Sequence, residues 1–87
     1  MTAIQENLLS AIDLALQGSW DAAHRLVQHY ESDVTAAWIH AVLHKIEGDA
    51  GNSRYWYRRA GRIDHFADEP RAELAEIRAM IVGQTNG

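Results

Sequence analysis

The fold is decided by one stretch of the chain, residues 36–62, which reads AAWIHAVLHKIEGDAGNSRYWYRRAGR. It has the pattern of a helix, a tight turn and a second helix. Gly48 suits the left-handed backbone conformation that ends a helix, and Gly61 takes the same place after the second helix. Two helices joined by so short a turn must run antiparallel. The stretch therefore predicts a helical hairpin.

The first helix of the hairpin is expected over about residues 34–47, with Ser32 or Asp33 as its N-cap. Alanines cover a second sector beside its main apolar stripe, so we expect this helix to be buried between neighbours. The stripe itself consists of Ile39, Val42, Leu43 and Ile46, and Trp38 flanks it.

The second helix is expected to begin between Asp49 and Asn52 and to end at Gly61. Arginines recur along one of its edges at 54, 58 and 62, beside an apolar face that should pack on the first helix. That face consists of Ser53, Trp56, Tyr57 and Ala60.

Three further helices are predicted outside this hairpin, over residues 3–17, 20–30 and from about 69 onward, with Asp68 as the cap of the last one. A loop before the last helix should turn Ile63 and Phe66 inward. Residues 1–82 are expected to form a single helical domain, and residues 83–87 a flexible tail. The expected core positions of these helices are Ile4, Leu8, Leu9, Ile12, Ala15, Leu16, Trp20, Ala23, Leu26, Val27, Tyr30, Leu74, Ile77, Met80 and Ile81.

No segment alternates with the period of a strand, so the predicted fold is all-α with five helices. Two stacked antiparallel hairpins and a C-terminal closing helix are the expected architecture. The chain has no cysteine, which excludes disulfides and zinc–thiolate sites. No apolar run of about 18 residues is present. The N-terminal MTAIQENLL lacks the basic start of a secretory signal, so a cytoplasmic protein is expected.

The charge is unevenly distributed over the 87 residues, whose net charge is −4. Residues 54–62 hold four arginines and no acid. This basic segment either pairs with acids nearby or contacts a partner, and the acidic remainder argues against nucleic acid. A protein partner or self-association is therefore expected, with Trp20, Trp38 and Trp56 as candidate anchors.

Two resemblances accompany these patterns. The start of each hairpin's second helix, at Gly18-Ser19-Trp20-Asp21 and Gly48-Asp49, repeats with an offset of 30 residues. This spacing resembles tetratricopeptide hairpins, which repeat every ~34 residues. Trp56-Tyr57-Arg58-Arg59-Ala60 resembles the second helix of Sel1-like repeats. Both resemblances imply stacked hairpins that bind proteins.

A closer resemblance rests on the pattern HxxxHxxEGDxxNxxYWYxRAG, which begins at His40 and ends at Gly61. It is similar to a group of small helical proteins. The resemblance implies that the hairpin is the distinctive part of the chain, and it implies no activity.

Two polar stripes on the hairpin are the candidate site. His40 and His44, at i and i+4, are spaced to ligate one divalent metal, with Glu47 or Asp49 adding an oxygen. Ala41 stands where an HExxH motif would have its glutamate. The alternative is that the two histidines only hydrogen-bond across the hairpin. The full set of candidate ligand-binding residues is His40, His44, Glu47, Asp49, Asn52, Tyr55 and Arg59.

Arg59, Asn52 and Tyr55 form the second stripe, which is suited to an anion. We expect the two stripes to face one another, with Arg59 paired to Glu47 or Asp49. Ser53 is the only hydroxyl near the two histidines in the sequence, and no nucleophile elbow or P-loop is present, so no catalytic residue is predicted. The expected function is a protein-interaction module, with a small-ligand, anion or metal-binding protein as the alternative.

Overall fold

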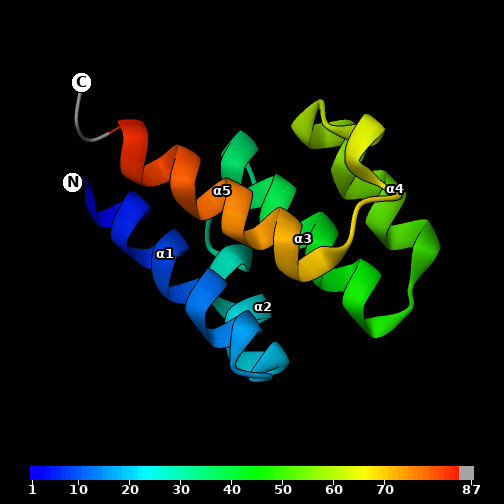
Figure 1. Ribbon diagram of the computed structural model, residues 1–87, viewed down its shortest axis with the longest axis horizontal. Coiled ribbons are helices and arrows are strands. Elements are labelled where there is room, and N and C mark those ends of the chain that lie inside the picture. The colour runs from blue at the N-terminus through cyan, green and yellow to red at the C-terminus, as the bar shows by residue number, and fades with distance from the viewer. Residues whose placement is uncertain (85–87) are drawn as a thin grey trace.

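A computed structural model describes residues 1–84, and most of these residues are helical (Figure 1). No strand occurs in this part of the chain, which confirms the all-α prediction. None of its helices is long and apolar enough to cross a membrane. The elements are α1 (Ala3–Leu16), α2 (Trp20–Gln28), α3 (Val34–Glu47), α4 (Ala50–Ala60), a 3-10 turn η1 (Ile63–His65) and α5 (Pro70–Gln84).

The hairpin of α3 and α4 has the predicted ends, because its caps are local. The side chain of Asp33 accepts a hydrogen bond from Ala36 N, and Asp49 does the same from Asn52 N. Gly48 and Gly61 have φ angles of 89° and 70°, so both adopt the left-handed conformation that a side chain would strain. At the start of α1, Thr2 and Gln5 form a capping box.

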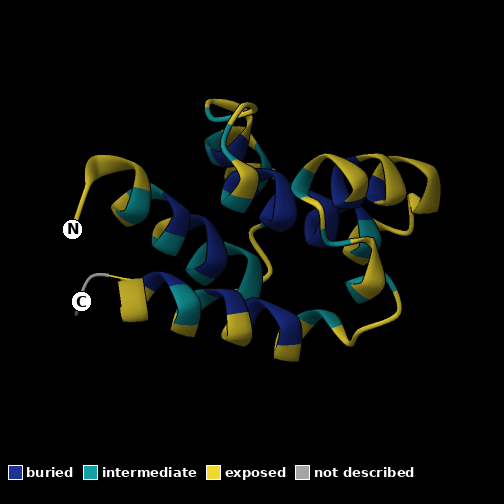
Figure 2. Cartoon of the chain, turned by 90° about the horizontal axis from the view of Figure 1, so that it is seen from above, coloured by how far each residue is buried: buried dark blue, intermediate teal, exposed yellow. Residues whose placement is uncertain are grey.

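Helix α3 lies at the centre of the molecule and contacts α1, α2, α4 and α5. Residues Ala36–His44 are buried without interruption, as the apolar girth of this helix predicted (Figure 2). The α1–α2 and α3–α4 pairs have the most extensive contacts, and α5 runs beside α1 (Figure 1). Five helices with these two pairs agree with the expected layout. Tetratricopeptide-like packing stays a prediction.

Three predicted core positions are wrong: Ile4, Ile46 and Ile63 are 40%, 44% and 44% exposed. Ile46 lies beside a groove lined by the end of α1 and the start of α5, where no helix covers it. Ile63 lies in η1 and points away from the core, whereas Phe66 packs against the core as predicted.

The observed ends of α2 and α5 differ from the predicted ones, because no glycine ends or begins the helix at these places. α2 ends at Gln28, since Tyr30 already belongs to the turn. At the start of α5 the cap is Glu69 in place of Asp68, because Glu69 Oε2 accepts the hydrogen bond from Ala72 N at 2.6 Å. α5 continues through Gly83 and Gln84, so these residues are not part of a tail. Residues 85–87 lie outside the described part of the chain.

The interior also holds a charge that the sequence did not reveal. Glu73 is 2% exposed and accepts hydrogen bonds from Trp38 Nε1, Tyr57 Oη and Lys45 Nζ, each at 2.7 Å. Lys45 also donates to the backbone carbonyls of residues 65, 66 and 68. Burial, followed by the bond to Glu73, raises the pKa of Tyr57, so its hydroxyl stays a donor. This network fixes α5 and the preceding loop against α3 and α4.

Candidate metal centre

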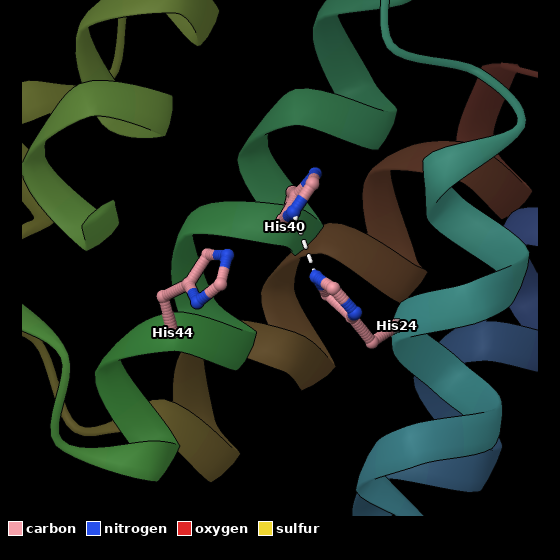
Figure 3. A group of neighbouring side chains, drawn as sticks. All are labelled: His24, His40 and His44. Atoms are coloured by element: carbon pink, nitrogen blue, oxygen red, sulfur yellow. Dashed lines mark hydrogen bonds between the residues drawn. The ribbon is translucent and has the colours of Figure 1, made fainter.

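Three histidine rings gather between α2 and α3 (Figure 3). His24 comes from α2, and His40 and His44 lie one turn apart on α3. One ring nitrogen from each residue lies within 4.8 Å of the other two. The Nε2 atoms of His24 and His40 are 3.0 Å apart and share a hydrogen bond. The rings of His40 and His44 stack with their centroids 4.9 Å apart.

Two tryptophans hold these rings in place. Trp20 stacks on His24 with centroids 4.6 Å apart, and Trp56 stacks on His40 at 3.9 Å. Trp20 is itself fixed, because its Nε1 donates a 2.6 Å hydrogen bond to the carbonyl of Leu43. The cluster therefore joins α2, α3 and α4 with aromatic faces on two sides.

The surroundings favour the neutral form of two of these imidazoles, His24 and His40, because they lower the pKa of both. Burial, followed by the neighbouring His24 and His44, lowers the pKa of His40 to about 3. Burial and then His44 also lower the pKa of His24, although Glu47 and Asp21 act in the opposite direction. A neutral imidazole offers a nitrogen lone pair, which is the form that binds a metal.

Glu47 orients the third ring. Its Oε2 lies 2.6 Å from Nδ1 of His44, so that nitrogen carries the hydrogen and donates it. Nε2 of His44 is then the nitrogen with a free lone pair. A carboxylate on the far nitrogen of a ligating histidine is the usual arrangement at metal sites, since it fixes tautomer and ring orientation.

The remaining predicted site residues do not join this cluster. The exposed Asp49 accepts bonds from N and Nδ2 of Asn52, and the backbone bond is the main reason its pKa is lowered. Atoms of His44, Glu47 and Asp49 also lie within 4.8 Å, but these two carboxylates are already hydrogen-bonded as described. Ser53, buried, donates to the carbonyl of Ala41 at 2.8 Å and is no nucleophile here.

The predicted ion pair of Arg59 with Glu47 or Asp49 is wrong. Arg59 donates to Oη of Tyr55 at 3.2 Å and to the carbonyl of Glu31 at 3.3 Å. The second polar stripe therefore runs along α4 and reaches the α2–α3 connection. Arg59 also lies over the ring of Trp56, with its guanidinium carbon 5.1 Å from the ring centroid.

His24 is the site residue that sequence reasoning missed. It lies in α2 between Ala23, a core position, and Arg25, which faces outward. A signal was nevertheless present, because His24 is four residues after Trp20 and three before Val27 and so shares their side of the helix. Its partner His40 is 16 residues further along the chain, and no local sequence pattern predicts a contact between residues so far apart.

The arginines of the basic segment form a second feature. Arg54 lies over the ring of Phe66, with the guanidinium carbon 4.6 Å from the ring centroid, and Arg62 lies over Trp38 at 4.3 Å. Within residues 1–84 the arginines at 54, 58, 59 and 62 form no ion pair with a carboxylate. Of the two alternatives for the basic segment, pairing with nearby acids is therefore the wrong one for these residues.

No protein-family model, curated protein or solved structure matches this chain.

Proposed function

We propose that this protein binds one divalent transition-metal ion through His24, His40 and His44. The observation that supports the proposal is the meeting of three imidazoles, from two helices, with donor atoms within 4.8 Å of one another. Two nitrogens bound tetrahedrally to one zinc ion at ~2.0–2.1 Å lie about 3.3 Å apart. The 3.0 Å between the Nε2 atoms of His24 and His40 needs only a small widening to match this value.

The donor set selects the class of metal. Imidazole nitrogens suit zinc, cobalt, nickel and copper, whereas magnesium and calcium prefer oxygen ligands. Glu47 supports the site from outside, through Nδ1 of His44, and is not itself a ligand in this proposal. The ion replaces the hydrogen bond between His24 and His40.

Isothermal titration of the tag-free protein with zinc chloride tests the proposal. We expect one ion per chain, and a loss of at least tenfold in affinity for His24→Ala, since one of three ligands is removed. His29→Ala is the matched control: this histidine directly follows α2, is exposed and lies outside the cluster. It should bind zinc as the wild type does.

The proposal fails if folded protein binds none of zinc, cobalt, nickel and copper. It also fails if His24→Ala binds as tightly as His29→Ala, because the ion would then be held elsewhere.

We propose a second function, binding of an acidic segment of a partner protein, on the evidence of α4. Its outer side carries Arg54, Arg58 and Arg59, all exposed, together with Tyr55, which is 49% exposed. No acid is present in residues 50–60, and no carboxylate of the described chain pairs with these arginines. Arginine and exposed aromatic side chains are enriched at protein interfaces.

Fluorescence anisotropy with a labelled peptide of alternating Asp and Glu tests this surface. Arg54→Gln/Arg58→Gln should weaken binding at least tenfold, whereas Arg25→Gln/Arg71→Gln, which removes the same charge elsewhere, should weaken it less than twofold. Equal losses in the two double variants would show attraction to net charge alone and contradict the proposal. Tighter binding of a single-stranded DNA of equal charge would contradict it as well.

A further inference from the structure

The histidine cluster offers an ion three ligands, and its polar neighbours are engaged elsewhere. Nε1 of Trp20 donates to the carbonyl of Leu43, and the hydroxyl of Ser53 donates to that of Ala41. The near carboxylate oxygen of Glu47 accepts from Nδ1 of His44. The chain has no cysteine. Among residues 1–84, the group that contains His24 and His40 has no fourth histidine or carboxylate.

The three rings also differ in exposure. His40 and His44 are 3% and 8% exposed, whereas His24 is partly exposed, so solvent reaches the cluster from the side of α2. On that side Trp20 lies stacked on His24 and meets His44 edge-on, with ring centroids 6.0 Å apart. A molecule that approaches the ion from this side must pass the indole of Trp20. Because this ring restricts the approach, a small ligand is favoured.

Coordination number separates two kinds of zinc site. Structural sites are closed by four protein ligands, whereas sites with three protein ligands keep the fourth position for water or substrate. We infer that the ion held by His24, His40 and His44 keeps one exchangeable position, occupied by water at rest and open to a small anion such as azide. This inference rests on the metal site proposed above. It makes that site one with an open coordination position, and not a closed structural site.

Cobalt(II) tests the open position, because the visible absorption of tetrahedral cobalt changes when one ligand is exchanged. The tag-free protein is loaded with one equivalent of cobalt chloride and titrated with sodium azide. We expect an intense visible band on loading, and a band shift that saturates with one azide per cobalt. His29→Ala should give both responses, and cobalt in buffer without protein should give neither.

The outcomes separate the two proposals. If no protein-dependent band forms on loading and no cobalt is retained on desalting, the metal site itself is wrong. If cobalt is retained with its band but azide leaves the spectrum unchanged, the metal site stands and the open position is overturned. Sedimentation that finds two chains per cobalt would also overturn it, since a second copy would then supply the fourth ligand.

Discussion

Glu73 shows how much one residue can depend on distant partners. Its side chain is fully buried, and its two carboxylate oxygens accept hydrogen bonds from the indole of Trp38, the phenol of Tyr57 and the ammonium group of Lys45. The spacing of α5 places residue 73 on the same side as Ile77 and Ile81, so the helical period does put it in the core. The charge argues against burial, and its donors lie 16 to 35 residues away. No local signal predicts such a meeting.

Replacing Glu73 should cost far more stability than replacing an exposed glutamate of the same helix. Glu73→Gln leaves the partly buried Lys45 without its counter-charge, and removing one partner of a buried pair costs roughly 3–5 kcal/mol. Chemical denaturation should show this loss in the free energy of unfolding. Glu76→Gln, at a position that is exposed, is the control and should cost under about 1 kcal/mol. Similar losses for the two variants would contradict a structural role for the buried carboxylate.

At the scale of elements, the best-predicted helices are those whose ends depend on residues next to them. Asp33, Gly48, Asp49 and Gly61 fix the hairpin of α3 and α4 by capping and left-handed geometry alone. The end of α2 has no such residue. The predicted helix, residues 20–30, therefore extends into the turn that follows Gln28. Which helices meet, and on which side, depends on long-range packing. The contact between His24 on α2 and His40 on α3 depends on this long-range packing.

Metal binding should tie α2 to α3 and raise the melting temperature. An ion that binds only the folded protein adds about 2.7 kcal/mol at a free concentration 100 times its Kd. Each kcal/mol moves the midpoint by about 4–8 °C in a domain of this size. Differential scanning calorimetry with zinc, and then with excess EDTA, should show a rise that the chelator reverses.

His24→Ala should remove most of that rise, because α2 then contributes no ligand, while His29→Ala should keep it. A zinc-induced rise of equal size in both variants would mean that the ion does not link the two helices.

At the scale of the whole molecule, the sequence predicted the fold class and the central position of α3, but not the relative rotation of its neighbours. The two polar stripes illustrate the difference. Each lies on its helix as the helical period requires, yet Arg59 reaches the carbonyl of Glu31 and never faces Glu47. The apolar face of α4 is buried as predicted, at Ser53, Trp56 and Tyr57, but this pattern does not tell which atoms of the neighbouring helices lie beside the polar stripe. The basic surface of α4 meets the histidine cluster through Trp56, which lies under Arg59 and stacks on His40.

The stacking of Trp20 and Trp56 on the candidate ligands has an optical consequence. Two of the three indoles of the chain touch the histidine cluster, while Trp38 is turned toward Glu73 and Arg62. The intrinsic fluorescence of the unlabelled protein is therefore weighted toward one place in the molecule. A paramagnetic ion such as copper(II) held there would quench the emission of the first two indoles, and Trp38 would supply the residual light. Titration of the purified protein with copper(II) should therefore report occupancy of the proposed site through its own fluorescence, without a dye.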